Sequence, residues 1–484
     1  EVQAVLIETI NNAETIILAD ADMNDFCIEW LKKHTNKTIQ LITSKNNTHH
    51  KQITVLDDAE SVLVEANNRL EKGENVWITS DSKIQVHKSK VAFEMLTDVS
   101  SQFNVADDEI LIITGDNKGE EAQKAFLENP DEESKKYRLI ISTPVISSGV
   151  SITNTHFKSV YAIFSNVVPA NEMLQAVGRV RAVNDIRVSF KKGHKKSRET
   201  IIHHLMDGEA LKNSRFLGNG LLEIDDMAYQ QAQITATVND SLNNFDREFL
   251  ILAQLKGYGV KKKGEKNTIT GLSKRANEYD IQRVLTAQPI TEDNAIQLKR
   301  TKPETQSERD SLDRYLVEEM AGKTSQQLNE DDITFYKNNG TSTVQNYELI
   351  HTKIDVVRSK EKLEYNECGE SNGKTSRALF MQKIITRLDG KTFKANDVDD
   401  LMQSLQKHHA ELNANQLGDF KWIRRPIVKL KNLLSKMGYE VILSNRTQND
   451  RYYKMVKNVQ VVKYVENRKK LQTEKSNDTT NDYI

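Results

Sequence analysis

The sequence predicts an α/β fold with a parallel sheet, followed by a mainly helical region and a small C-terminal module of helices and a hairpin. Between about residues 36 and 195, short apolar runs alternate with helical stretches. The runs lack regular polar–apolar alternation, which indicates strands buried on both faces of a sheet. Only 6 Pro and 20 Gly occur in 484 residues, and this scarcity favours helices over linkers. From residue 196 onward the pattern is polar and helical, without a repeat of fixed period.

The elements expected in the first part of the chain follow from hydrophobic periodicity. The first helix begins at Val2, a buried strand covers residues 15–19, and an amphipathic helix ends at His34. Further strand candidates are residues 39–43, 76–80, 110–114, 139–142 and 160–164. The helix candidates between them are residues 58–70, 82–100, 120–127 and 170–180.

The C-terminal pattern is three helices followed by a β-hairpin. The first helix ends at Gly390, the second begins near Asn396, and the third begins at Pro426, since proline suits the first helical position. Residues 439–443 and 451–456 predict the two strands of the hairpin. Three helices followed by a hairpin form a winged helix, a variant of the helix-turn-helix plan.

Composition excludes several classes of protein. The formal charge is −1, from 68 Lys and Arg against 69 Asp and Glu, so any nucleic-acid surface must be a local patch. Two cysteines, Cys27 and Cys368, are too few for a disulfide framework and predict a reducing, cytoplasmic setting. No apolar run is long enough for a membrane span, so no membrane partner is expected. The chain opens without Met and without a signal peptide, and we expect a beginning to be missing.

Two stretches carry residue types suited to phosphate chemistry. A loop after the apolar run 139–142 contains Thr143, Gly149 and Ser151, whose small size lets backbone N–H groups approach phosphate oxygens. The second stretch places Gln175, Arg179 and Arg181 on or near a helix, with Gly178 among them. Two guanidiniums suit a γ-phosphate whose charge is neutralised during phosphoryl transfer. Either stretch alone fits a buried strand or solvated arginines equally well, but both together favour phosphate chemistry.

These motifs carry a resemblance to a known family. Thr-Pro-(x)4-Gly-Val-Ser from Thr143 and Gln-(x)2-Gly-Arg-Val-Arg from Gln175 resemble the fifth and sixth motifs of superfamily 2 helicases. The second is most similar to origin-of-replication binding proteins of herpesvirus type and their plasmid and phage relatives. Residues 76–82 resemble the fourth motif, and Ala19-Asp-Ala-Asp-Met23 resembles an element of the same relatives. Residues 246–260 are similar to cyanobacterial-type plasmid replication proteins, so the resemblance spans roughly residues 1–330.

The resemblance implies a division of the chain into five parts. Residues 1–35 would end a first RecA-like lobe, and residues 36–195 would form the complete second RecA-like lobe. A helical middle region (196–375), a winged helix (376–460) and a charged, partly disordered tail (461–484) would follow. ATP and Mg²⁺ would be bound mainly by the missing first lobe, which carries the P-loop.

The resemblance also assigns roles to residues. The catalytic group would be Arg179, Arg181 and Gln175, of which the two arginines sense the γ-phosphate. The nucleotide site would be completed by Gly149, Ser151, Asp20 and Asp22, and DNA would be contacted by Thr143 and Ser80. No metal site is expected from this chain's own residues. The aspartate pair keeps two other interpretations, a magnesium site like that of Toprim folds and an Asx turn that caps the next helix.

A P-loop is not expected elsewhere in the chain. The nearest candidate is residues 368–375, but Cys368 occupies the place of the first glycine and no buried strand precedes it. Capping of the following helix by Thr375 or Ser376 explains these residues more simply. This chain alone is therefore expected not to hydrolyse ATP.

Positive charge is concentrated in the C-terminal module. The segment between residues 420 and 457 contains ten Lys and Arg but only two acidic residues, Glu440 and Asp450. This distribution is typical of DNA-binding domains. The DNA contacts expected there are Arg425, Lys429, Asn432, Lys436 and Arg446. Protein docking is the alternative for this module. A second basic stretch, residues 187–198, is expected to be a loop that could follow a phosphate backbone.

The sequence therefore predicts a replication-origin-binding, ATP-dependent superfamily 2-like DNA helicase of a plasmid, phage or mobile element, here without its P-loop lobe. Its partners would be origin duplex DNA, single-stranded DNA and other replication proteins. Two alternatives stay open. One is a non-catalytic DNA-binding replication initiator or regulator, and the other is the helicase part of a primase-helicase.

Overall fold

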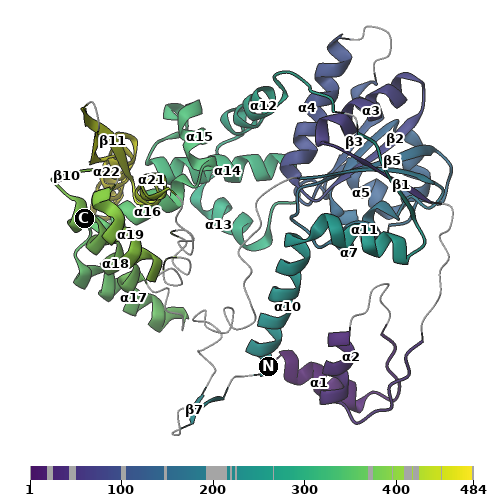
Figure 1. Cartoon of the computed structure of the whole chain (residues 1–484), viewed down its shortest axis with the longest axis horizontal. Helices are drawn as coiled ribbons and strands as arrows, with labels where there is room; N and C mark the ends of the chain where they lie inside the picture. Colours follow the sequence, from purple (N-terminus) through teal and green to yellow (C-terminus); the bar gives the residue numbers. More distant parts are fainter. Residues whose placement is uncertain are drawn as a thin grey trace. The chain divides into compact units, whose positions relative to one another are not determined.

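The computed structural model describes residues 2–18, 25–42, 51–99, 105–146, 150–191, 215–217, 221–223, 226–264, 266–368, 374–394, 396–407, 412, 417, 425–447 and 450–481. Contacts between residues divide the chain into two compact units (Figure 1). Unit 1 consists of residues 1–114, 125–198 and 237–270. Unit 2 consists of residues 115–124, 199–236 and 271–484.

Within the described residues, unit 1 is built on a parallel sheet of seven strands. In spatial order the strands are β3 (Ile110–Ile113), β4 (Leu139–Ser142), β2 (Asn75–Ser80), β5 (Phe157–Phe164), β6 (Asp185–Phe190), β1 (Gln52–Leu56) and β9 (Gly259–Lys262). Every pairing is parallel, which confirms the predicted fold class. Each strand's amino end therefore lies at one edge of the sheet and its carboxyl end at the other.

Helices cover both faces of this sheet (Figure 1). One group is α3 (Ala59–Glu71) with α4 (Lys83–Val99), and a second is α7 (Ala170–Val177) with α11 (Phe245–Leu255). The buried core includes Trp77 of β2, whose ring lies 5.9 Å from that of Phe126 in α5 (Glu121–Glu128). The predicted helices agree with these to within a few residues, because each buries an apolar stripe with helical spacing.

Two predicted strands are wrong. Residues 15–18 and 39–42 have no regular secondary structure, and Ile17 and Ile42 are 87% and 83% exposed. Residues 19 and 43, the ends of those predictions, lie outside the described residues. The β-branched residues favour strands locally, but a strand persists only with a hydrogen-bonded neighbour. The flanking helices α1 (Val2–Asn12) and α2 (Asp25–His34) are present as expected.

Three strands of the seven-stranded sheet were not predicted: β1, β6 and β9. Arg187 was expected in a basic loop, but it lies in β6 and forms ion pairs with Asp185 at 3.0 Å and with Glu65 of α3. Lys263 also contacts Glu65, at 2.6 Å. Because these carboxylates neutralise Arg187, it is a structural residue of the sheet. Residues 192–198 of the same stretch lie outside the described residues.

Unit 2 is mainly helical in its described part. Its helices include α12 (Leu272–Thr286), α13 (Glu292–Thr301), α14 (Gln306–Ala321), α15 (Glu330–Lys337), α16 (Gly340–His351), α17 (Ile354–Cys368), α18 (Lys374–Leu388), α19 (Asp399–Lys407), α21 (Pro426–Ser435) and α22 (Val459–Asn481). A short hairpin, β7 (Arg215–Leu217) and β8 (Leu221–Glu223), precedes α10 (Asp226–Asn243), whose residues are divided between the units.

The predicted hairpin is present as β11 (Tyr439–Arg446) and β12 (Arg451–Lys457). A third strand that the sequence did not indicate, β10 (Thr392–Phe393), pairs with β12 and gives the order β10-β12-β11. The chain thus runs α18, β10, α19, α21, β11, β12. The C-terminal module therefore has the expected helices and hairpin, extended to a three-stranded antiparallel sheet.

One hydrophobic cluster joins the helical middle of unit 2 to this module. It runs from Ile281 in α12 through Leu430 in α21 to Val465 in α22. Val461 and Tyr464 of α22 are buried, so the start of the segment expected to be a charged tail belongs to the core. Tyr464 donates a hydrogen bond of 2.7 Å to the buried carboxylate of Asp332, which also pairs with Lys323 at 2.6 Å.

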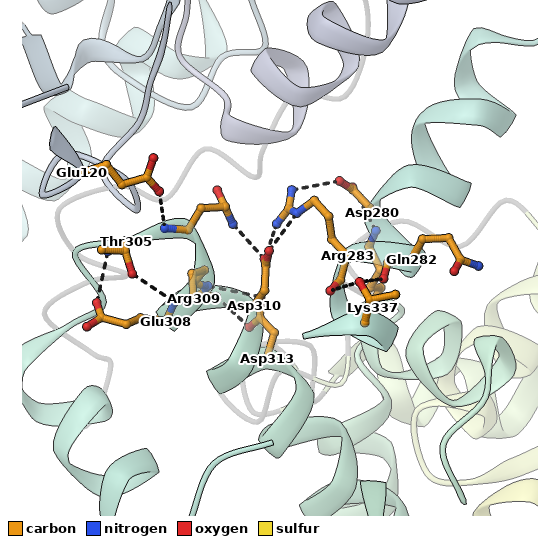
Figure 2. A network of polar contacts seen from close by, with 12 residues as sticks. Glu120, Asp280, Gln282, Arg283, Thr305, Glu308, Arg309, Asp310, Asp313 and Lys337 are labelled. Carbon is orange, nitrogen blue, oxygen red and sulfur yellow. Dashed lines mark hydrogen bonds and ion pairs between the residues drawn. The ribbon is translucent and has the colours of Figure 1, made fainter. Parts of the chain in front are cut away.

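A polar network fixes residues 115–124 to α14 within unit 2 (Figure 2). The backbone N–H of Gln306 donates to the Glu120 carboxylate at 2.9 Å, and the Gln306 side chain donates to Asp310 at 2.8 Å. Asp310 also accepts from the Arg283 guanidinium of α12 at 2.5 and 3.2 Å. The Asp310 carboxylate thus accepts hydrogen bonds from side chains of two helices, α12 and α14. Its loss would leave the positive charge of Arg283 without its closest carboxylate.

Asp310→Ala is expected to lower the free energy of unfolding by about 2 kcal/mol, because the Arg283 side chain, only 18% exposed, would lose its closest carboxylate. Asp355→Ala is the matched control, since its pair with Arg358 is 92% and 65% exposed. That control should cost about 0.5 kcal/mol or less. Urea denaturation of both variants measures the difference, and equal costs would contradict the structural role of Asp310.

None of the helices in the described part of the chain is long and apolar enough to cross a bilayer.

Candidate functional site

The two arginines lie in a turn that follows α7. The helix ends at Gly178, whose backbone N–H donates to the carbonyls of Leu174 and Gln175 at 3.2 and 3.0 Å. A Cβ on Gly178 would lie 3.3 Å from the Gln175 carbonyl oxygen and 3.6 Å from the Tyr258 hydroxyl. The second distance is an ordinary van der Waals contact, so the turn lies beside Tyr258, the residue before β9.

A short backbone bridge joins the two sequence stretches suited to phosphate chemistry. Ile152 donates to the carbonyl of Arg179 at 2.9 Å, and Arg181 donates to the carbonyl of Ile152 at 2.7 Å. Ser151 is thereby held beside the arginines, and Arg181 Nε lies 3.4 Å from Ser151 Oγ. The two stretches therefore lie together, because the segment after β4 pairs with the turn after α7.

The Arg179 side chain is half-buried and lacks a full set of partners. Its Nε atom is buried without a hydrogen-bond acceptor. Burial, together with the neighbouring positive charge of Arg181, holds the pKa of Arg179 below its usual range. A guanidinium stays protonated even so, and an anion would supply the acceptor that the described residues do not.

Lys51 is a third cation in this group, and the sequence reasoning missed it. Its Nζ atom donates to the carbonyl of Val180, between the two arginines, at 3.3 Å. Burial and then repulsion from Arg181 lower the pKa of Lys51 to about 8. Only the pairing of β1 with β6 brings residue 51 to the arginines, which lie about 130 positions later in the sequence.

These residues gather at the edge formed by the amino ends of the strands. Lys51 directly precedes β1, Tyr258 directly precedes β9, and Arg179 and Arg181 come shortly before β6. Tyr258 is buried, and burial raises the pKa of its hydroxyl. In the described part of the chain, no carboxylate forms an ion pair with Lys51, Arg179 or Arg181. We call these three residues with Ser151 the amino-edge cluster.

The described residues also contain no group of three acidic, His or Cys side chains that could hold a metal ion. Because no described carboxylate pairs with its cations, the positive charge of the amino-edge cluster is not balanced by described side chains. Arg181 is exposed, whereas Lys51 and Arg179 are partly buried. Burying an unpaired cation costs free energy, which an anion would return.

The carboxyl edge holds the predicted DNA contacts of the lobe. Thr143 follows β4, and Ser80 ends the neighbouring strand β2. Thr143 is 6% exposed, and its backbone N–H donates to Ile113. Ser80 is fully buried, and its hydroxyl donates to the carbonyl of Ile163 at 2.7 Å. This internal bond corrects the expectation that the Ser80 hydroxyl contacts DNA.

Gln175 lies in the last turn of α7, half-buried, and its role in catalysis stays a prediction. Three other predicted nucleotide-site residues, Asp20, Asp22 and Gly149, lie outside the described residues.

The P-loop-like stretch has an acidic neighbour where a phosphate would bind. Residues 369–373 lie outside the described residues, but Lys374 and Thr375 begin α18. Their backbone N–H groups donate to the Glu361 carboxylate of α17 at 3.0 and 3.1 Å. A carboxylate thus caps this helix from a neighbouring helix, so residues 374–375 are a helix start rather than an anion site.

The predicted DNA contacts of the C-terminal module form one stripe along α21. Arg425, Lys429, Asn432 and Lys436 have the spacing i, i+4, i+7 and i+11, which places them on one side of a helix. All are exposed except Lys429, which is half-buried. Burial and the charge of Lys429 lower the pKa of Lys436. On the opposite side of the helix, Leu430, Leu434 and Met437 are buried. We call these four residues the α21 stripe.

The hairpin of the module ends in an exposed tip that carries Arg446. The tip is closed by a hydrogen bond of 2.9 Å from the Thr447 N–H to the Asp450 carbonyl. Lys394 pairs with the Asp450 carboxylate at 2.8 Å, so that acidic group is neutralised within the module. Positive charge therefore dominates the α21 stripe and the tip.

Comparison with known proteins gives one family match. Residues 23–199 match the sequence model of the family described as origin of replication binding protein. This confirms the predicted resemblance to that family for the segment that contains the sheet of unit 1 up to β6. No curated protein matches the chain.

The solved structures that this chain resembles include three of low identity. The S. cerevisiae Dbp5 bound to RNA and ADP BeF3 is 15% identical, with a TM-score of 0.29 over 52% of this chain and 58% of that one. Mss116p DEAD-box helicase domain 2 bound to an RNA duplex is 11% identical, with a TM-score of 0.27, over 56% and 84%. The Pyrococcus furiosus Hef helicase domain is 12% identical, with a TM-score of 0.24, over 83% and 78%. This chain spans 58% of the length of the first.

Proposed function

We propose that this chain is part of a replication-origin-binding, ATP-dependent superfamily 2-like DNA helicase that serves a plasmid, phage or mobile element. The observation that carries the proposal is the amino-edge cluster. It joins the motif around Ser151 to the motif around Arg179, and it lies inside the segment that matches the origin-binding family. A pair of guanidiniums without carboxylate partners suits the phosphates of a nucleotide.

In this proposal unit 1 is the second RecA-like lobe. The P-loop that binds the nucleotide is supplied by protein outside the described residues. Arg179 and Arg181 bind oxygens of the γ-phosphate and neutralise charge that builds up during its transfer to water. Ser151 orients Arg181 through its hydroxyl. Magnesium would neutralise phosphate charge from the P-loop side, and the described residues of this chain offer no cluster of ligands that fits it.

The C-terminal module would bind the DNA duplex as a winged helix. Its chain order of helix, strand, two helices and two strands supports this assignment. The α21 stripe would enter the major groove. Asn432 would read a base edge, and the three cations of the stripe would contact phosphates. Arg446 at the hairpin tip would reach the neighbouring groove or backbone. Other replication proteins are further proposed partners of the same molecule.

Charge reversal of the α21 stripe tests this DNA surface. The double variant Lys429→Glu with Lys436→Glu is expected to weaken duplex binding about 10- to 100-fold and to reduce the slope of log K against log salt by about 2. Fluorescence anisotropy with labelled origin DNA over a salt series measures both quantities.

The matched control is Lys360→Glu with Lys362→Glu, since both lysines are exposed on α17 and the charge change is the same. This control should leave binding within about threefold, because its charges lie outside the proposed interface. If the stripe variant binds DNA with the same affinity as the control, the C-terminal module is not part of the DNA interface.

The ATP-dependent part of the proposal is tested by DNA-stimulated ATP hydrolysis in the intact protein, with a P-loop lobe present. One observation favours a second function, a replication initiator that binds DNA without catalysis: Glu361 caps the helix at the P-loop-like residues of this chain. The two functions differ in one outcome. An intact protein with Arg179 replaced that still supports replication after losing ATPase activity would favour the initiator.

A further inference from the structure

We propose that Lys51 is a third phosphate-binding residue of the amino-edge cluster, where its ammonium binds an oxygen of the same polyphosphate as Arg179 and Arg181. This inference rests on the proposed function, because it takes the nucleotide as the anion. It adds a residue that belongs to neither of the two sequence motifs and that precedes β1.

The first step is position. Lys51 reaches across to the arginine turn and donates to the carbonyl of Val180, the residue between Arg179 and Arg181. Its own carbonyl accepts from the N–H of Gly259 at 2.9 Å, and Gln52 donates to Asn184 at 2.8 Å. The backbone at residue 51 is therefore fixed between β6 and β9, and the side chain lies against the arginine turn through its contact with Val180.

The second step is the count of donors. A lysine ammonium carries three N–H bonds, and the contacts within the described residues use one of them, on Val180. A partly buried ammonium with unused donors beside Arg181 suits an oxyanion, because each phosphate oxygen accepts several such bonds.

The third step is charge. The charged group that acts on Lys51 directly is Arg181, which repels it. Arg179 and Tyr258 in turn interact with Arg181. No described carboxylate pairs with Lys51, so burial and repulsion leave its pKa at about 8. A bound polyanion would stabilise the ammonium and raise this pKa. Protonation and anion binding are therefore linked.

The sign of the pH dependence follows from this linkage. Below pH 8 Lys51 is charged and contributes to binding, and above pH 8 it loses its proton and that contribution. Arginine at position 51 would stay charged throughout. Binding of a polyphosphate should thus weaken as the pH rises from 7 to about 9.5, and Lys51→Arg should reduce this weakening.

A purely structural role makes a different prediction. If Lys51 only held the Val180 carbonyl, Lys51→Met would destabilise the fold and leave anion binding per folded molecule unchanged. If Lys51 is an uncompensated cation, Lys51→Met should raise the melting temperature at pH 7, where the buried charge is unfavourable. The same variant should weaken binding.

The experiment is calorimetric titration of the 484-residue chain with inorganic tripolyphosphate at pH 7 and about pH 9.5. The variants are Lys51→Met, Lys51→Arg and Arg179→Ala, with Lys72→Met as a control on an exposed lysine at the end of α3. At pH 7, Lys51→Met should weaken binding about 10- to 100-fold, the loss of one charge-assisted contact. Lys51→Arg should bind tripolyphosphate at both pH values. Because arginine stays charged, any change in affinity that remains in this variant comes from ionisation of the probe. Lys72→Met should bind with the affinity of the unmodified chain.

The outcomes separate the inference from the proposed function. If Arg179→Ala weakens binding and Lys51→Met does not, Lys51 is not a ligand, and the arginine site stands. If neither variant weakens binding, or the unmodified chain does not bind the probe, both proposals fall. A Lys51→Met variant with a lower melting temperature and unchanged affinity would assign Lys51 to structure alone. Lys51→Arg keeps the test decisive should the methionine variant not fold.

Discussion

Replacement of Arg179 by alanine is expected to lower the rate constant of ATP hydrolysis by the intact protein about a thousandfold or more, with a small change in KM for ATP. Arginines that neutralise a transferring phosphoryl group contribute about 10³ to 10⁵ in kcat. Arg179 fits that role because its Nε is buried without an acceptor and no described carboxylate neutralises it. Steady-state ATPase measurements with saturating DNA give both constants.

Arg247→Ala is the matched control for this prediction. Arg247 is exposed on α11 in the same unit, and it is not part of the amino-edge cluster. Its replacement should leave kcat within about twofold, as is usual for surface substitutions. Retention of kcat within about tenfold in Arg179→Ala would remove Arg179 from phosphoryl transfer.

Gly322→Ala is expected to have the largest effect on folding, with a loss of about 4 kcal/mol in the free energy of unfolding of unit 2. Gly322 ends α14 at φ +59°, a conformation that costs a non-glycine residue free energy. An added Cβ would also lie 2.4 Å from the backbone nitrogen of Arg468 in α22. Since backbone cannot move aside like a side chain, α22 would be displaced from the core.

Gly390→Ala isolates the first of these two causes, the positive φ. Gly390 has a similar φ of +68°, but an added Cβ would meet no atom within 4 Å. This variant should therefore lose only the conformational preference of glycine, about 1 kcal/mol. Urea denaturation followed by circular dichroism measures both variants. Equal losses in the two would mean that the contact between α14 and α22 contributes little.

The sequence predicted those elements whose signal is local. The helices α3 and α7 follow from the spacing of apolar residues, and β2 and β4 follow from uninterrupted apolar runs. The two motifs around Ser151 and Arg179 could be recognised because each lies within a few residues of sequence. The bridge between Ile152 and Val180, which brings the two motifs together, was not predicted.

Elements decided by distant partners were not predictable in the same way. Residues 15–18 and 39–42 have the composition of strands but no hydrogen-bonded neighbour in the described part of the chain. Conversely, β6 carries Asp185 and Arg187, two charged residues that indicate a polar loop in the sequence. In the structure, Glu65 of α3 neutralises Arg187, which allows it to lie in a strand. β9 is a strand because β1 lies beside it. In each case pairing outweighs intrinsic preference.

The candidate site was incomplete for the same reason. Lys51 has no motif around it, and only the adjacency of β1 and β6 brings it to the arginines. Ser80 shows the opposite error. The resemblance implied that Ser80 contacts DNA, but the Ser80 hydroxyl is bonded inside the sheet. Side-chain direction at a strand end depends on the neighbouring strand, which the sequence alone does not specify.

The central claim is that Arg179 and Arg181 face the γ-phosphate of a bound nucleotide. The most direct test compares the affinity of the intact protein for ADP with its affinity for ADP–aluminium fluoride, which resembles the transferring phosphoryl group, before and after Arg179→Ala. The account predicts that ADP binding changes by less than about threefold, whereas binding of the fluoride complex weakens about a hundredfold or more. Equal affinities of the variant and the unmodified protein for both ligands would contradict it.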